Sequence, residues 1–524
     1  MRKTYFPKLF STGDFKLNPE ILNKTQIITF WAVVVFTVIG KLILISYNMM
    51  DMGDSATRVW NALWWAQNPF FIMPESGHPF WFYFMGPIIM ATGEIYYTSI
   101  ITMIILMTIA NIYIFKTTLM LSDFKTALIA FIIVTLNPVI FRLNFEPYAQ
   151  QTYLASFCIL VYYFIKAVSS EESKKYFIIA GIFAFIALFS RPEAIFVLAP
   201  LCVLASLTKK RGNGYFISLA LVFQVIWIAI SLAAYGTLFQ TIESADQYTD
   251  PVNIEGLNLG LRLKGFFLPY YFLVLGLTII IFYYFIKGLI YFYKKYPNVI
   301  LITLLIPVLF PALANGAAGA KSTVYHTTHY IYLMFLISPI FCAIGLNIDL
   351  GKFKSAVLKY VIASLVIISC IPLSYVKEFV PEQNNKLFPK IIQFIVTSDE
   401  PEESRKLIKF IDENINSYPA LIFDADDNAS SILYIPFRTK LAPREKIMIS
   451  SYNIPRDKEG LLNEIKSFMK INPKIIIMTR KSPTLMNQIF TEITIGKKYI
   501  RNDLQKVLET DKWIIYTYHS SNSE

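Results

Sequence analysis

Long apolar runs alternate with short polar segments from residue 27 to residue 377, whereas residues 378–524 have the mixed composition of a soluble protein. A helix needs about 20 apolar residues to span a bilayer, and an open sheet would leave its backbone unpaired in lipid. The pattern therefore predicts a polytopic α-helical membrane protein with about eleven transmembrane helices. These helices are expected near residues 27–47, 95–115, 125–143, 148–166, 176–190, 194–208, 215–235, 266–287, 298–315, 329–347 and 357–377.

The first apolar run, Ile27–Tyr47, follows a mostly polar segment, residues 1–26. It is longer than the apolar part of a signal peptide, and no small-residue cleavage site follows it. We therefore expect it to remain as a membrane anchor. The sequence divides into an N-terminal segment (1–26), a transmembrane domain (27–377) and a C-terminal domain (378–524).

Positive charges predict the orientation of the helices, because cytoplasmic loops are enriched in Lys and Arg. Every second loop holds most of them: Lys3, Lys8, Lys16, Lys24, Lys116, Lys125, Lys174, Lys175, Lys209, Lys210, Arg211, Lys294, Lys295, Lys352 and Lys354. The alternate loops hold few: Arg58, Arg142, Arg191, Arg262, Lys264 and Lys321. We expect a cytoplasmic N-terminus, and an odd number of helices then places the C-terminal domain outside the cytoplasm.

The C-terminal domain alternates helical and strand patterns, which indicates a small α/β layer fold. Amphipathic helices are expected at Glu402–Asn414 and Lys458–Lys470, and strands at Ala420–Asp424, Lys446–Ser450, Lys474–Thr479 and Trp513–Tyr518. Two outer loops of the membrane domain are long. Residues 48–94 are rich in tryptophan and proline and suit short interfacial helices, and residues 236–265 are polar and acidic.

Composition supports the membrane assignment, since 55% of the residues are hydrophobic and 16% are charged. The net charge of +12 arises largely in the clustered loops, and no basic stripe with interleaved aromatic residues indicates nucleic-acid binding. The four cysteines lie in apolar segments, so neither a disulfide framework nor a zinc-binding spacing is predicted.

Charged residues at the outer membrane face are the candidates for chemistry, because placing them near hydrocarbon is costly. Asp51 and Asp54 directly follow the first helix, and their spacing puts both carboxylates on one side of a helical turn. Two interpretations stay open. One carboxylate acts as a general base on an acceptor hydroxyl, or the pair caps a helix that begins near Ser55.

Two further outer residues also have two interpretations each. Glu146, in RLNFEPYAQQ, either binds an acceptor or complements the N-terminal dipole of the fourth helix. Arg191, in FSRPEA, lies at a tight turn, where it either holds a lipid-linked phosphate or pairs with Glu193 or snorkels to the interface.

The segment AGAKSTVYHTTHYIYLMFLISP holds Lys321, His326 and His329, which could bind a phosphate or leaving group or serve as interfacial anchors. Its GAKST is not a phosphate-binding loop, because Ala320 replaces the required glycine and no strand precedes it. DADDN at 424–428 resembles the metal-binding motif of soluble sugar-nucleotide transferases, but its domain is too small for that fold, and a strand-to-helix turn is the better interpretation.

The order of these features resembles the GT-C superfamily of membrane glycosyltransferases, in particular relatives of the protein O-mannosyltransferases and the lipid A aminoarabinose transferase. The likeness covers about residues 27–345. GDSATRVWNALWWAQNP is similar to the family's first-loop pattern, with Asp54 and Ala62 in place, and GHPFWFYFMGPI to the segment after it. The runs around Glu146 and Arg191 and the segment HYIYLMFLISP are similar to later family segments. Two departures are Ser55, where the family usually has Glu, and His329, where it usually has Arg.

The resemblance implies an inverting transfer of a sugar from dolichyl or undecaprenyl phosphate to an outer acceptor, which could be a glycan, a lipid or a protein. Asp54 would be the general base, with Asp51 as its substitute, and Glu146 would assist. Arg191, Lys321, His329 and Lys264 would stabilise the departing lipid phosphate. No nucleotide sugar, soluble cofactor or metal is expected.

The alternative function is a lipid or glycan transporter or flippase without transferase activity. Transporters commonly have two corresponding halves, broken helices and charges at mid-membrane. Here no halves correspond and the charges gather at one face, which favours an enzyme. A non-catalytic membrane protein with a binding domain outside is the third possibility.

Overall fold

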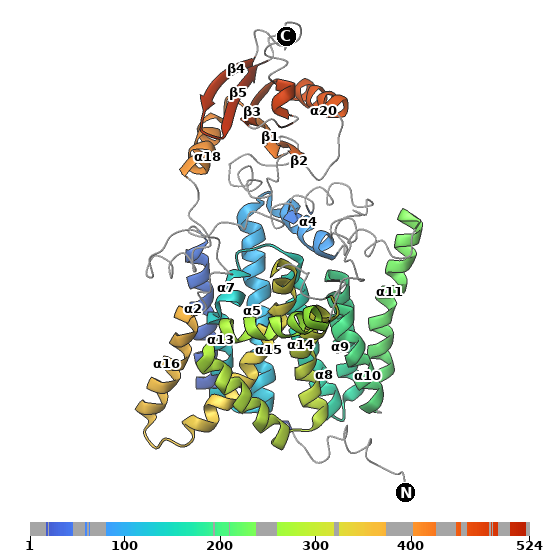
Figure 1. Ribbon diagram of the computed structural model, residues 1–524, viewed down its shortest axis with the longest axis vertical. Helices are drawn as coiled ribbons and strands as arrows, with labels where there is room; N and C mark the ends of the chain where they lie inside the picture. The colour runs from blue at the N-terminus through green and yellow to red at the C-terminus, as the bar shows by residue number, and fades with distance from the viewer. Residues whose placement is uncertain are drawn as a thin grey trace.

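A computed structural model shows a bundle of long helices with a smaller sheet-containing unit beyond one end (Figure 1). The structure describes residues 17–18, 20–45, 58–59, 62, 80–191, 194–208, 210–236, 259–318, 324–373, 402–425, 447–451, 458–481, 484, 486–490 and 504–519.

The bundle begins with a helix whose start is fixed by its sequence. Asn23 and Gln26 form a capping box, in which each side chain accepts a hydrogen bond from the other's backbone N–H at 2.9 and 3.0 Å. The first helices are α2 (Lys24–Leu44), α4 (Phe80–Thr92), α5 (Tyr96–Leu121) and α6 (Phe124–Leu136). α4 lies within residues 48–94, where the sequence predicts short helices.

The chain breaks after α6, which differs from the single helix expected over 125–143. Asn137 has an extended backbone (φ −60°, ψ 122°), since the residue before a proline avoids the helical region. Its side chain then accepts hydrogen bonds from the N–H groups of Val139 and Ile140 at 3.0 and 3.3 Å and starts a new short helix. The break gives α7 (Pro138–Arg142), which is followed by α8 (Ala149–Ser169).

Seven more helices complete the bundle. They are α9 (Ser173–Ser190), α10 (Ala194–Thr208), α11 (Asn213–Tyr235), α13 (Leu259–Lys295), α14 (Asn298–Ala318), α15 (Val324–Leu350) and α16 (Ala356–Leu373). α13 bends at Thr278, whose backbone is non-helical (φ 66°, ψ 157°), so its first half runs across the bundle and its second half along it (Figure 1). It also begins at Leu259, within the loop expected to end at residue 265.

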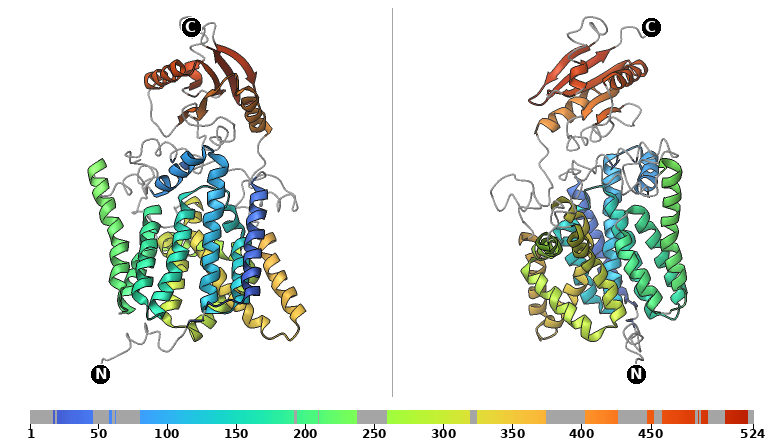
Figure 2. Two further views of the ribbon diagram at one scale, coloured as in Figure 1. Left: turned by 180° about the vertical axis from the view of Figure 1, so that it is seen from behind. Right: turned by 45° about the vertical axis from the view of Figure 1, so that its right-hand side comes forward.

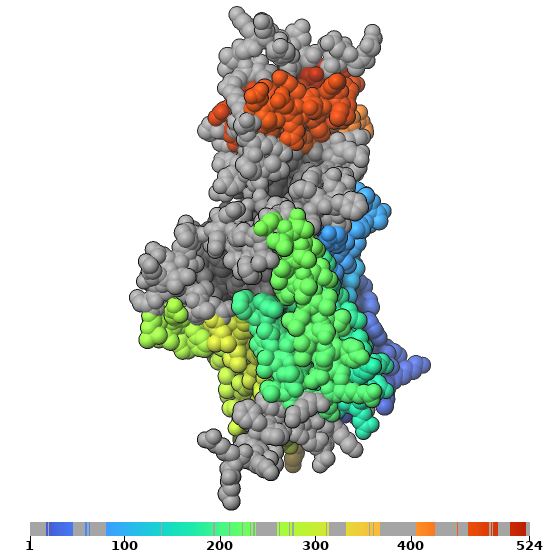
Figure 3. Space-filling view, turned by 90° about the vertical axis from the view of Figure 1, so that its right-hand side faces the viewer, coloured from blue at the N-terminus to red at the C-terminus, as the bar shows by residue number. Residues whose placement is uncertain are grey.

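Seven helices in the described parts of the chain are long and apolar enough to cross a membrane, and five shorter apolar helices accompany them. α11 covers one side of the bundle (Figure 3) and exposes apolar side chains such as Leu221 and Val225. α8 lies at the centre, with most of its residues buried. An apolar outer surface around a buried central helix is what lipid as solvent requires, so the chain is a polytopic membrane protein.

α13 and α15 approach each other closely through two glycines. A Cβ atom at Gly288 would overlap the carbonyl oxygen of Phe341, and one at Gly345 would overlap that of Tyr284. Small residues at such positions let helix backbones meet in a membrane, where no hydrophobic effect drives association. These glycines therefore fix the distance between the two helices.

The C-terminal unit is a five-stranded sheet in the order β2-β1-β3-β5-β4. Its elements are α18 (Glu402–Asn414), β1 (Ala420–Ala425), β2 (Ile447–Ser451), α20 (Lys458–Ile471), β3 (Lys474–Arg480), β4 (Leu504–Glu509) and β5 (Trp513–His519). β1, β2 and β3 are parallel, and β5 is antiparallel to β3 and β4. α18 and α20 lie on opposite faces of the sheet (Figure 2).

Alternate residues of each strand fill the two layers. Leu421 and Phe423 belong to the apolar cluster of α18, whereas Ile422 belongs to that of α20. The α18 cluster continues into Val59 and Trp81 of the first outer loop. The sheet unit therefore packs through its α18 layer on the same side of the bundle as α4.

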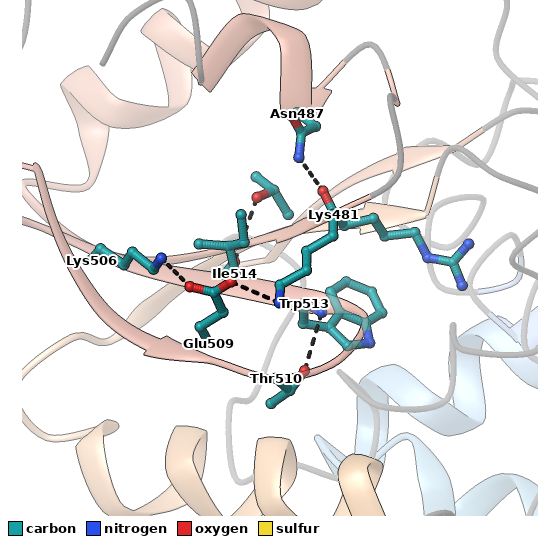
Figure 4. A network of polar contacts seen from close by, with 9 residues as sticks. Lys481, Asn487, Lys506, Glu509, Thr510, Trp513 and Ile514 are labelled. Atoms are coloured by element: carbon teal, nitrogen blue, oxygen red, sulfur yellow. Dashed lines mark hydrogen bonds and ion pairs between the residues drawn. The ribbon is translucent and has the colours of Figure 1, made fainter. Parts of the chain in front are cut away.

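Polar contacts secure one edge of this sheet (Figure 4). Glu509 binds the ammonium groups of Lys481, at 2.7 Å, and Lys506. The turn between β4 and β5 closes through Thr510, whose hydroxyl accepts a hydrogen bond from the N–H of Trp513 at 3.1 Å. Hydrogen bonds from the two lysines lower the pKa of Glu509 from 4.5 to about 2.

Candidate active site

Glu146 is the candidate residue whose surroundings the structure describes most fully. It lies between α7 and α8, and 2% of its surface is exposed. Its carboxylate forms an ion pair with the Nε of Arg142, one helical turn earlier. The Arg142 side chain is about a third exposed, at 35%, so the pair has one buried member and one accessible member.

The loop that carries Glu146 is held by buried amides. The Gln151 side chain donates hydrogen bonds to the carbonyl oxygens of Leu143, at 2.7 Å, and Glu146. Its own oxygen accepts a hydrogen bond from the N–H of Tyr148 at 3.2 Å, where α8 begins. Gln151 thus satisfies backbone groups on both sides of Glu146 and fixes the loop in one shape.

An ion pair of this kind has two chemical uses. A carboxylate held beside a guanidinium can accept hydrogen bonds from hydroxyl groups. The guanidinium of Arg142, aligned by Glu146, is a group of the kind that binds phosphate or carboxylate oxygens. The arrangement therefore suits binding and orientation.

Arg191 lies at the same end of the bundle as Glu146, because α8 and α9 form an antiparallel pair joined by a short turn at the other end. It directly follows the last residue of α9 and has an extended backbone. The adjacent Phe189 packs against Phe80 and Tyr83 of α4, with ring centroids 5.7 and 5.9 Å apart. The first outer loop thus reaches the turn that holds Arg191.

Two more candidates lie near the starts of α13 and α15. Lys264 is exposed near the start of α13. His329 lies in the first two turns of α15. The helix α15 packs against α7, the short helix that ends at Arg142. Asp51, Asp54, Lys321 and the side chain of His329 lie outside the described part of the chain, so their predicted roles stay predictions.

The described parts of the first outer loop lie close to Glu146. Val59, Ala62 and Trp81 are fully buried in one apolar cluster with Phe145 and Ala149, which flank the Glu146 loop. The family-like segment around Ala62 therefore packs on the loop that carries the second acidic candidate. This packing joins two segments that are about 80 residues apart in the sequence.

Sequence reasoning missed Lys41, because it is a single lysine within an apolar run. It lies in the last turn of α2, and 2% of its surface is exposed. The packing of α2 shows that the lysine faces the bundle. A lysine on the opposite face of this helix would lie in lipid and would extend its ammonium group to the membrane interface.

Within the described residues, no three His, Cys, Asp or Glu side chains form a group that could hold a metal ion. A cavity of about 360 Å³ opens at the opposite end of the bundle, where its lining includes Ser122, Asp123, Tyr291 and Lys295. Asp123 is used there as the N-cap of α6, since its carboxylate accepts a hydrogen bond from the N–H of Thr126 at 2.8 Å. That cavity is separate from the end of the bundle that holds Glu146.

No known protein-family profile matches the sequence, and no curated protein matches it. Solved structures do. ArnT from Cupriavidus metallidurans bound to undecaprenyl phosphate aligns with a TM-score of 0.60 at 9% identity, over 95% of this chain and 99% of that chain. The same protein in the apo state aligns with a TM-score of 0.53 at 9% identity, over 94% and 97%.

The Archaeoglobus fulgidus oligosaccharyltransferase in its apo form aligns with a TM-score of 0.49 at 13% identity, over 86% of this chain and 69% of that chain. The alignments with ArnT include both the membrane bundle and the C-terminal unit, since they span nearly the whole of both chains. The chain therefore has the GT-C fold, which is the fold of ArnT.

Proposed function

We propose that the protein is an inverting glycosyltransferase that moves a sugar from a polyprenyl phosphate to an acceptor hydroxyl at the extracytoplasmic membrane face. The observation that carries the proposal is the fold it shares, over nearly its full length, with a protein whose structure holds undecaprenyl phosphate. A transporter with the same fold would have no need for carboxylates and cations gathered at one end of its helices.

The proposal includes a topology of eleven spans with a cytoplasmic N-terminal segment (1–26), a membrane domain (27–377) and an extracytoplasmic C-terminal domain (378–524). α4 and the sheet unit would then lie on the outer side, above the residues assigned to chemistry. The sheet unit would help to recognise the acceptor. This placement agrees with the positions of the clustered lysines and arginines in the loops.

In the proposed reaction, Asp54 removes the proton from the acceptor hydroxyl, and Asp51 is the next candidate for that role. The acceptor oxygen attacks the anomeric carbon as the bond to the lipid phosphate breaks, through an oxocarbenium-like transition state. Glu146 and Arg142 orient the sugar or the phosphate. Arg191, Lys321, His329 and Lys264 stabilise the negative charge that develops on the leaving phosphate. The reaction needs neither a nucleotide sugar nor a metal.

The test is turnover of a panel of polyprenyl-phosphate sugars by purified protein, with host membrane extract as the source of acceptor. Wild type, Asp54→Asn and Glu146→Gln are compared with Glu172→Gln, an exposed carboxylate at the opposite end of the bundle. We expect one donor to be consumed, Asp54→Asn to lose roughly a thousandfold or more in rate, and Glu172→Gln to be unchanged. Full turnover by Asp54→Asn would move the base to Asp51.

A further inference from the structure

Three charged side chains in the described part of the chain are buried: Lys41, Glu146 and Asp424. Glu146 is paired with Arg142, and Asp424 accepts hydrogen bonds from the N–H of Arg480 at 3.0 Å and from a threonine hydroxyl. Lys41 forms no hydrogen bond or ion pair with any residue that the structure describes. It is thus the buried charge that lacks a described partner.

Lys41 lies on the face of α2 that packs into the bundle. On that face, Phe30 stacks on Phe115 of α5 with ring centroids 4.0 Å apart. Further along the same face, Val38 and Ile45 join an apolar cluster. Lys41 falls between these two residues in the helical repeat and therefore shares their face.

The cluster around Lys41 also contains the loop of the candidate active site. Phe141 and Phe145, which flank Arg142 and precede Glu146, belong to it together with Val38 and Ile45. α2 also packs against α5 and α6, and α6 leads directly into α7. Lys41 therefore lies on the face of α2 that meets the cluster containing the Glu146 loop.

The other side of α2 offers a route for a lipid. Phe36, Ile39 and Ile43 are exposed on the bundle's outer surface at 79%, 50% and 61%. In a membrane protein, such side chains face acyl or prenyl chains. A prenyl chain lying along this surface would carry its phosphate to the end of α2, where Lys41 lies.

An unpaired ammonium group in apolar surroundings destabilises a protein, and ionisable residues at such depth are usually retained for function. The C-terminal end of a helix such as α2 provides only a partial negative charge. A full anion is therefore the missing partner. Among anions, a lipid phosphate is delivered at this depth, and lysine binds phosphate as a compact point charge.

We propose that Lys41 binds the phosphate of the polyprenyl-phosphate donor where it enters at the outer end of α2. The proposal rests on the function proposed above and adds a binding residue that no sequence pattern indicated. The anion would arrive with the substrate, which explains why the lysine has no partner among the described residues. It follows that removing Lys41 weakens binding of the lipid without weakening the fold.

The test compares binding of undecaprenyl phosphate and of the uncharged undecaprenol by native mass spectrometry of the purified protein. Lys41→Met and Lys41→Arg are studied with Lys24→Met, which removes an exposed lysine from the opposite end of the same helix. We expect Lys41→Met to weaken phosphate binding by about tenfold or more and to leave undecaprenol binding unchanged. Lys41→Arg should retain part of the preference, and Lys24→Met all of it.

Melting of the lipid-free protein provides the second readout. Lys41→Met should melt at or above the wild-type temperature, because a lone buried charge has been removed. A clearly lower melting temperature would mean that Lys41 neutralises a carboxylate of the chain itself, such as Asp51 or Asp54, and would overturn the proposal.

The binding data separate two failures. If wild type prefers the phosphate and Lys41→Met keeps that preference, the assignment of Lys41 is wrong and the proposed function stands. If wild type binds undecaprenol as tightly as undecaprenyl phosphate, both the proposed donor and the role of Lys41 are refuted.

Discussion

Replacing Gly288 with alanine should force α13 and α15 apart. The added Cβ would lie 1.9 Å from the Phe341 carbonyl oxygen, whereas real Cβ atoms essentially never come within 3.0 Å of another atom. This neighbour is backbone and cannot rotate away. Both helices carry candidate site residues near their starts, Lys264 on α13 and His329 on α15. The substitution therefore affects packing and site geometry together.

The expected loss of stability is about 3 kcal/mol, at the upper end of the range for overpacked cores, because relief requires a helix to move. Gly40→Ala is the matched control. Gly40 lies within α2, and a Cβ there would have no atom within 4 Å. Alanine is the better helix former, so this control should gain up to about 1 kcal/mol.

Equilibrium unfolding in mixed detergent micelles, with denaturing detergent as the variable, measures both changes on one scale. Gly345→Ala should behave like Gly288→Ala, since its Cβ would overlap the Tyr284 carbonyl oxygen from the other helix. If Gly288→Ala unfolds like wild type or like Gly40→Ala, the close contact between α13 and α15 does not exist as described.

Three further predictions concern buried and paired charges. Arg142→Met should lower stability by roughly 3–5 kcal/mol, because the buried carboxylate of Glu146 loses its ion pair, and a second change, Glu146→Leu, should restore most of it in the same unfolding assay. Asp424→Ala should speed proteolysis of the C-terminal unit, because the Arg480 N–H and the Thr484 hydroxyl lose their acceptor, whereas Asp424→Asn should do so less. The pKa of Glu509 is lowered to about 2 in the folded protein, so its contribution is present above about pH 4.5 and is lost as pH falls through 2. Glu509→Gln should thus melt slightly below wild type at pH 7, with a difference that shrinks below pH 4.5.

The apolar runs predicted the positions of the bundle helices well, since lipid allows few alternatives to a helix. The break at Asn137 was not predicted, because the run from Val139 to Phe141 is as apolar as the helix before it, although Pro138 is a local signal for such a break. The bend at Thr278 has no comparable signal, because no proline or glycine lies at that position. The strand order β2-β1-β3-β5-β4 depends on long-range pairing that the pattern of single strands does not contain.

The candidate site was partly predictable for a physical reason. Placing a charged side chain near hydrocarbon costs free energy, so charged residues at the ends of apolar runs stand out in the sequence. This pattern identified Glu146 and Arg191. The i, i+4 spacing of Arg142 and Glu146 could have indicated their ion pair from the sequence. Lys41 could not be distinguished from a snorkelling lysine, because which face of α2 is buried depends on its contacts with α5 and α6.

Release of polyprenyl phosphate in detergent solution tests the central claim most directly. Detergent removes the two compartments that a transporter needs, so only an enzyme has an observable activity there. With host membrane extract as acceptor, our account predicts release of polyprenyl phosphate from one donor of the panel, matched by sugar in the acceptor fraction. Lipid movement across liposomes by folded protein that releases no polyprenyl phosphate from any donor in detergent would contradict it.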